Sequence, residues 1–256
     1  DAADSSDEIL TESEKDAIGE IANISMGTAA TTLFSLVNRR VEISTPVVSF
    51  SNWDKIVDEY EKPCVFIKIG YTQGLNGSNI LVLKEKDVKI ITDLMMGGDG
   101  TNINGEIGEL HLSAISEAMN QMMGSSATSL SSMLNRTIDI SPPIAEVVDL
   151  KNTLNEGEID SFLSEEFVKI SFHMEIGDLV DSEIMQLYPP AFVKEMCKGV
   201  SQNMELDTQS VTEDVPQSSN TATQAAPIQQ PQDSGSMNNA SANSQGMINE
   251  NMMKDR

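Results

Sequence analysis

Two long segments of the chain, about 12–37 and 106–134, carry apolar residues at every third or fourth position. That spacing predicts two long amphipathic helices. Elsewhere apolar and polar residues alternate, which is typical of half-buried strands. The strands predicted in this way are 65–69, 80–83, 167–172 and 183–187, together with two that proline interrupts, 41–48 and 138–148.

Glycine-containing turns separate the paired strands, and a short helix follows each pair. The turns lie at 74–77 and 177–178, and the helices at 85–96 and 190–198. The order of elements is therefore the same in both halves of the chain. It predicts an α+β fold in which an antiparallel sheet is covered by helices.

The two long helices open an internal repeat. Residues 16–46 align with 113–143 at an offset of 97 without a gap, and 15 of these 31 positions are identical. The chain thus encodes one unit twice, over about 10–105 and 106–204, and we expect two copies that share a core with pseudo-twofold symmetry.

The composition differs at both ends of the chain. Residues 205–256 are rich in Gln, Asn, Ser and Pro and show no apolar period, so we expect a disordered linker or tail. Residues 1–9 are acidic and are expected to be flexible. Because the chain begins at Asp1 rather than Met, we expect it to be part of a longer protein.

Charge and composition exclude several classes of function. The chain holds 16 Lys and Arg against 40 Asp and Glu, a net charge of −24, which disfavours nucleic acid as a ligand. No apolar run is long enough to predict a membrane span. Cys64 and Cys197 fit no metal or redox spacing and are expected to be buried thiols. His111 and His173 are isolated, so we expect no metal site.

One side of the first long helix is polar and the other is apolar. A wheel places Asp16, Glu20, Asn23 and Gly27 on a single stripe. The second helix repeats this stripe with Ser113, Glu117, Asn120 and Gly124. The side expected to face the core includes Ile18, Ile21 and Ile24.

Polar residues on a helix are commonly no more than a solvated surface, but a glycine there costs about 1 kcal/mol relative to alanine. Gly27 and Gly124 therefore suit a surface that another backbone approaches, or packing between the two helices. The same Glu, Asn and Gly spacing in both copies favours a functional reading, although symmetry of the fold alone can also preserve a repeat.

The residues of the stripe limit the chemistry. No Ser, Cys or His stands at helical spacing to form a nucleophile and base pair. Two carboxylates and an amide offer few ligands for a cation. An Asn can orient a water molecule, which suffices in phosphoryl transfer, where catalysis is largely positioning. A Glu can pair with a lysine on a partner.

The order of these residues resembles the signature of the CheC–CheX–FliY phosphatases. That signature has Asp or Ser, three residues, Glu, two residues, Asn, about 22 residues and Pro. The two matches are Asp16, Glu20, Asn23 and Pro46, and Ser113, Glu117, Asn120 and Pro143. The resemblance covers about residues 10–204 and implies the CheC-like fold, a tandem repeat with long helices packed on an antiparallel sheet.

The resemblance also implies a function. The family dephosphorylates the chemotaxis response regulator CheY. Asn23 and Asn120 would position the attacking water, and Glu20 and Glu117 would pair with the regulator's active-site lysine. The Mg²⁺ would belong to the regulator. The other motif residues would serve partner binding or shape the following strand: Asp16, Ser113, Gly27, Gly124, Pro46 and Pro143.

The FliY branch is the preferred interpretation, and two alternatives to it remain open. The tail fits the FliY branch, in which a linker leads to a FliN-like domain and the partners are FliM- and FliG-type switch proteins at the cytoplasmic face of the flagellar basal body. A stand-alone CheC would instead have the deamidase CheD as partner. A scaffold that binds CheY without catalysis is the third possibility.

Overall fold

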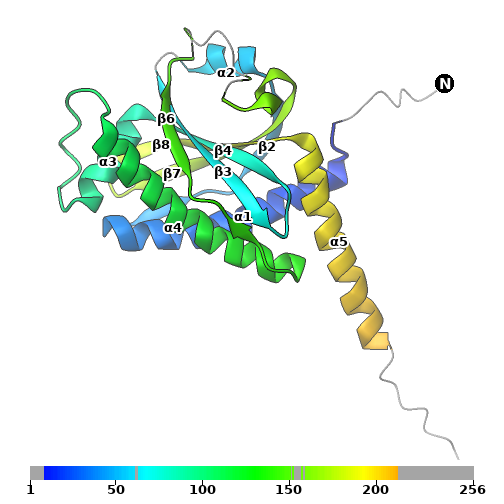
Figure 1. Ribbon diagram of the computed structural model, residues 1–256. Coiled ribbons are helices and arrows are strands. Elements are labelled where there is room, and N and C mark those ends of the chain that lie inside the picture. Colours follow the sequence, from blue (N-terminus) through cyan, green and yellow to red (C-terminus); the bar gives the residue numbers. More distant parts are fainter. Residues whose placement is uncertain (1–8, 61–62, 151, 153–156, 158, 213–256) are drawn as a thin grey trace, which may run out of the picture. The chain divides into compact units, whose positions relative to one another are not determined.

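The computed structural model describes residues 9–60, 63–150, 152, 157 and 159–212, with side chains up to residue 202 (Figure 1). The expectations for most of residues 1–9 and for the tail beyond Thr212 therefore lie outside the described residues. None of the described helices is long and apolar enough to cross a membrane.

Five α-helices and one short 3-10 helix are present in this part of the chain. Their bounds are α1 Glu12–Val37, α2 Trp53–Glu59, α3 Glu85–Met95, α4 Glu109–Leu134, α5 Pro190–Thr212 and η2 Ser161–Ser164. Figure 1 shows α1 and α4 together below the sheet, and α2 above it. The two long helices thus form a layer of their own.

Local signals fix the ends of the long helices. Thr11 caps α1, because its hydroxyl accepts a hydrogen bond from the backbone of Glu14 while the Glu14 carboxylate accepts one from the backbone of Thr11. The helices α1 and α4 end at Asn38 and Asn135, which have φ of 49° and 47°. Asparagine tolerates this left-handed conformation, so both copies of the repeat end the helix in the same way.

Eight strands form one antiparallel sheet. Their bounds are β1 Val41–Ile43, β2 Val47–Ser51, β3 Cys64–Gln73, β4 Gly77–Lys84, β5 Asp139–Ile140, β6 Ile144–Val148, β7 Phe167–Ile176 and β8 Val180–Tyr188. The order is β1-β7-β8-β4-β3-β5, with β2 also paired to β7 and β6 to β3. The α+β fold with an antiparallel sheet is therefore confirmed.

The two repeats exchange strands within this sheet. The strands that follow α1 pair with β7 of the second repeat, while the strands that follow α4 pair with β3 of the first. At the centre β4 pairs with β8, with Leu81 opposite Gln186. Each repeat therefore completes the sheet of the other.

Side chains that alternate along the strands contribute to two hydrophobic cores, one on each side of the sheet. Val65 and Ile67 face the long helices and belong to the large core, which also includes Ile18 and Ile115. Phe66 points to the other side, into a smaller core under α2 and η2. The long helices thus bury one side against the sheet and leave the other for solvent or a partner.

Three elements differ from the sequence prediction. Helix α5 runs to Thr212 instead of ending at Lys198, because the residues that follow include good helix formers such as Met, Glu and Leu. Helices α2 and η2 were not predicted. Both are too short to show a helical period, and each begins with a capping side chain, Asn52 and Asp160.

Candidate functional site

The first candidate site lies on the exposed side of α1, and site 1 denotes Asp16, Glu20, Asn23 and Gly27. All four are exposed. Within the described part of the chain, no side-chain hydrogen bond or ion pair engages Glu20 or Asn23. Both polar groups are therefore available to a partner while a buried helix side holds them in place.

The apolar side of α1 is rotated relative to the prediction. Ile18 and Ile21 are buried, as expected, but Ile24 is 43% exposed. The prediction that Ile24 faces the core was wrong. The buried arc also takes in Ala22, Met26 and Ala29, so its centre lies away from Ile24. Ile24 instead adds apolar surface one residue beyond Asn23.

The second candidate site lies in a groove of about 420 Å³ between α4 and the start of β6. Site 2 denotes Ser113, Glu117, Asn120 and Gly124. The first three line the groove, and Pro143 lines its opposite wall. Ser113 and Glu117 are exposed, whereas Asn120 is half-buried. The structure thus brings the second Glu and Asn together with the proline of the same motif.

The two glutamates have different surroundings. The Glu117 carboxylate accepts a hydrogen bond of 2.7 Å from the side-chain amide of Gln121. The equivalent position in α1 is Ile24, which cannot donate one. Glu117 is therefore oriented by its own helix, while Glu20 is free to turn.

The two motif glycines have open space beside them. A Cβ added to Gly27 or Gly124 would meet no atom within 4 Å outside its own helix. Packing between the two helices therefore does not require glycine at these positions. The other interpretation, that the absent side chain leaves room for an approaching partner, stays a prediction.

The motif prolines lie in the breaks between β1 and β2 and between β5 and β6. Pro46 is half-buried and Pro143 is buried. The residue that follows each proline, Val47 or Ile144, is 65% or 69% exposed. Val47 and Ile144 were not predicted as site residues, although the repeat offset pairs them. Each motif proline therefore precedes an exposed apolar residue, and Pro143 and Ile144 both line the groove of site 2.

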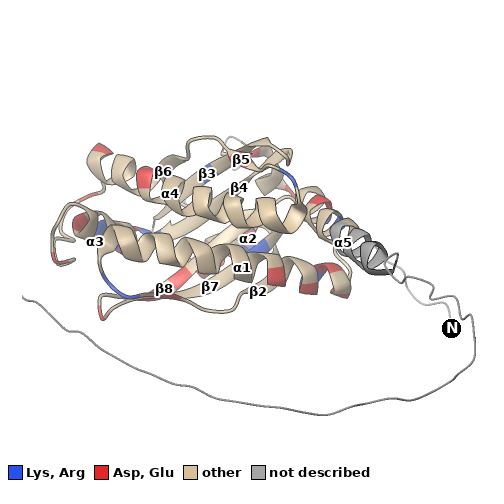
Figure 2. Ribbon diagram, turned by 90° about the horizontal axis from the view of Figure 1, so that it is seen from below, with Lys and Arg blue, Asp and Glu red and all other residues tan. Residues whose placement is uncertain are grey.

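The structure keeps the two sites apart. The long helices are antiparallel, because Thr28 pairs with Ser129 and Thr32 with Ser125 (Figure 2). This register sets Asn23 about 14 residues along the axis from Asn120, which at the helical rise is about 20 Å. The two Glu and Asn pairs therefore form separate sites.

The described residues hold no group of three or more His, Cys, Asp or Glu side chains that could bind a metal ion. His111 accepts a hydrogen bond from the backbone of Gly108 at the start of α4. His173 lies against Glu175 on β7.

Comparison with known proteins agrees with this architecture. The chain matches the CheC-like family over residues 14–50 and 110–147, which cover most of the two long helices and of the strands after them. It is 48% identical over 191 residues to the flagellar motor switch phosphatase FliY of Bacillus subtilis, a match that covers 75% of this chain and 50% of that protein. It is 24% identical over 143 residues to the CheY-P phosphatase CheC of the same organism, covering 54% and 67%.

A solved structure extends the match in three dimensions. The crystal structure of Thermotoga maritima FliY has a TM-score of 0.69 and 42% identity, covering 76% of this chain and 99% of that one. The chain spans about half the length of the curated FliY that it matches. With that fold and that identity, the chain belongs to the CheC-like family.

Proposed function

We propose that this chain hydrolyses the aspartyl phosphate of the phosphorylated response regulator CheY at the flagellar motor switch. One observation carries the proposal. Two separate Glu and Asn pairs face outward from α1 and α4 in a chain of the CheC-like family, with Asn120 half-buried in its groove and the other three residues exposed. The names of the curated relatives, FliY and CheC, support the same reaction and substrate.

The two asparagines can supply the catalytic step. A carboxamide both donates and accepts hydrogen bonds, so Asn23 or Asn120 can hold one water molecule in a fixed direction. The acyl phosphate on the partner is already activated, and correct placement of the water is what remains. Neither asparagine has an intramolecular side-chain partner to break first among the described residues.

The two glutamates can orient the partner. A carboxylate on a helix surface forms a charge-assisted hydrogen bond with an ammonium group. Glu20 is free for this role, and Glu117 offers the oxygen that Gln121 leaves open. The lysine would come from the regulator, as would the Mg²⁺ that balances its phosphate charge.

The level of identity favours FliY over CheC as the guide to partners. Identity to B. subtilis FliY is 48%, against 24% to CheC. We therefore propose FliM- and FliG-type switch proteins as neighbours, on the cytoplasmic face of the flagellar basal body, rather than CheD.

Phosphate release from phosphorylated CheY tests the proposal with Asn23→Ala, Asn120→Ala and the double variant. The double variant should lose about 100-fold of the acceleration, as expected for a lost hydrogen-bonding group that acts in the transition state. Ser35→Ala with Ser132→Ala is the matched control, because these exposed residues occupy twin positions further along α1 and α4.

The outcomes separate the alternatives. An unchanged rate in the double variant would show that the asparagines do not position the water. A wild-type chain that binds phosphorylated CheY without accelerating phosphate loss would be a scaffold, and the proposed activity would be wrong.

A further inference from the structure

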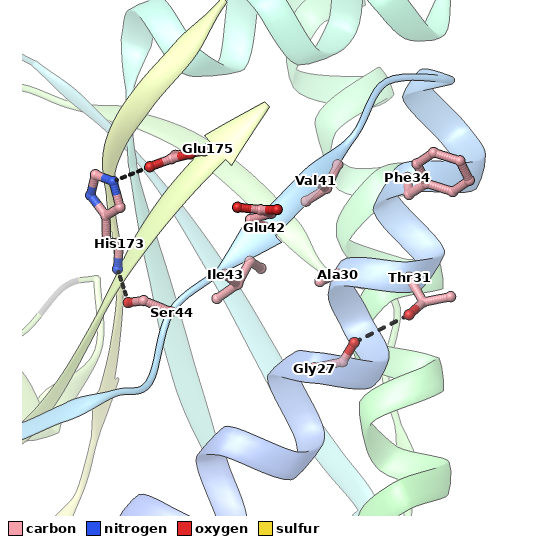
Figure 3. Close-up of a pocket in the computed structure, with 10 residues that line it drawn as sticks. All are labelled: Gly27, Ala30, Thr31, Phe34, Val41, Glu42, Ile43, Ser44, His173 and Glu175. Carbon is pink, nitrogen blue, oxygen red and sulfur yellow. Dashed lines mark hydrogen bonds and ion pairs between the residues drawn. The ribbon is translucent and has the colours of Figure 1, made fainter. Parts of the chain in front are cut away.

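A groove of about 570 Å³ lies between α1 and β1 (Figure 3). Its helix wall includes Gly27, Thr31 and Phe34, and its other wall is formed by β1 and by His173 and Glu175 of β7. We call it the Phe34 groove. Figure 3 shows Phe34 at one end of the helix wall and Gly27 at the other.

The groove continues directly from site 1. Gly27 is the last residue of that site, and Thr31 and Phe34 follow on the same side of α1 at helical spacing. A protein that places its acyl phosphate at Asn23 therefore extends over the groove if it lies along the helix. The open space beside Gly27 leaves its backbone approachable at the junction.

The repeat provides an internal comparison for Phe34. Its twin in α4 is Ser131, whose hydroxyl accepts a hydrogen bond of 2.9 Å from the backbone of Ile138. The fold is thus built with a small polar residue at this position. Phe34 is 48% exposed, which leaves a large apolar side chain in water. The aromatic ring is therefore not required by the fold of the repeat.

The rim of the groove is acidic. Glu42 and Glu175 are both exposed, and His173 lies 3.1 Å from Glu175 and 3.5 Å from Asp181. Two carboxylates, Glu42 and Glu175, line the groove, and Asp181 lies beyond them against His173, whereas Arg40, which contacts Glu42, is not a lining residue. The groove combines an apolar inner surface, called its floor, with carboxylates at the rim. Such a surface complements a segment of a partner in which an apolar side chain lies next to a basic one.

We propose that the Phe34 groove binds a segment of the response regulator held at site 1, through an apolar side chain flanked by a lysine or arginine. The inference rests on the proposed function and adds a docking surface built around Phe34, a residue that the second repeat replaces with Ser131. It follows that the two sites hold the same regulator through different contacts.

The test uses a chain with Glu117→Ala and Asn120→Ala as parent, so that site 1 alone binds and hydrolyses the regulator. The beryllofluoride-activated regulator is the binding probe, and phosphate release gives KM and kcat. Phe34→Ser should raise both Kd and KM about tenfold, the effect of losing one buried aromatic anchor, and leave kcat unchanged. Met96→Ser is the matched control, because Met96 is 49% exposed at the end of α3.

Glu42→Gln with Glu175→Gln is a second variant that leaves the apolar floor intact. It should raise Kd and flatten the salt dependence of binding. Unchanged Kd and KM in both variants would overturn the docking surface. A parent that binds the activated regulator without hydrolysis would sink the proposed activity, while the Kd comparison would still decide the groove. A parent that does not bind the regulator at all would overturn both.

Discussion

The hydroxyl of Thr28 on α1 lies 2.7 Å from the hydroxyl of Ser129 on α4. At the repeat offset of 97, Thr28 corresponds to Ser125 and Ser129 to Thr32. The hydroxyls of Thr32 and Ser125 are also close, 2.6 Å apart. The pseudo-twofold axis therefore passes between the two bonds. In Figure 2 the middle parts of α1 and α4 lie side by side and carry neither acidic nor basic residues. The bonds fix the register of the helices and with it the positions of Asn23 and Asn120.

We expect the two hydroxyls of a pair to be energetically coupled. Thr28→Val or Ser129→Ala should each lower the free energy of unfolding by about 1 kcal/mol, because a half-buried hydroxyl loses its partner. The double variant should lose less than the sum of the two. Urea unfolding measures this cycle, and Thr32→Val with Ser125→Ala repeats it on the other side of the axis. Fully additive losses would show that the bond contributes nothing.

Alanine at the motif glycines should stabilise the chain and impair its activity. Gly27→Ala and Gly124→Ala should each raise the free energy of unfolding by about 0.5–1 kcal/mol, since both glycines are helical with open space beside them. CheY-P hydrolysis should slow, because a methyl group then meets the partner. Gly97→Ala is the control. Space is also open there, but its φ of 86° makes alanine destabilising. Unimpaired hydrolysis in both variants would remove the glycines from the docking surface.

Removal of the glutamate charge should weaken binding more than turnover. In the Asn120→Ala background, Glu20→Gln should raise KM about tenfold, because a charge-assisted hydrogen bond becomes a neutral one. The salt dependence of kcat/KM should also flatten. Asp178→Asn, an exposed change in the β7–β8 turn, is the control. A lower kcat at constant KM would assign Glu20 to the chemical step instead.

The two thiols should react slowly. Burial raises the pKa of Cys64 to about 11, and burial, with Glu14 as a smaller cause, raises that of Cys197 to about 11. At pH 8 the thiolate fraction is about 100-fold lower than at the ordinary pKa. Iodoacetamide should therefore alkylate the unfolded chain much faster than the folded one, and Cys197→Ser isolates Cys64. Equal rates would contradict the burial.

The same thiols affect stability at high pH. Because the folded pKa is the higher one, the folded state keeps its protons longer than the unfolded state. Their contribution to stability is complete below pH 9, the ordinary thiol value, and is lost as the pH rises through 11. Between pH 9 and 11 the free energy of unfolding should fall less steeply with pH in the Cys64→Ser variant than in the wild type.

Most of the fold could be predicted because its signals are local. The period of the long helices, the alternation in β3 and β4, and the repeat itself depend on neighbouring residues. Strand pairing does not, and nothing in the sequence of β1 shows that it joins β7, more than 120 residues away. The exposed side of Ile24 was missed for a related reason. A wheel gives relative directions, but the sheet decides which arc is buried.

Some features of the candidate sites could likewise be predicted from the sequence, and others depend on the tertiary structure. The spacing of Glu20, Asn23 and their twins was visible in the sequence, and so was the polar stripe. The groove around Asn120 and the Phe34 groove depend on strands that fold back beside the helices, so residues such as Ile144 and His173 could be assigned only from the structure.

The exchanged strands set a condition on how such a duplicated chain can exist. A polypeptide with one repeat would expose the unpaired edge of its long hairpin and would have no neighbour for its own short strands. It could satisfy both only by pairing with a second identical molecule about a twofold axis. In the present chain the two halves of that dimer are covalently linked. The exposed surface of each half can therefore change in sequence independently of the other half.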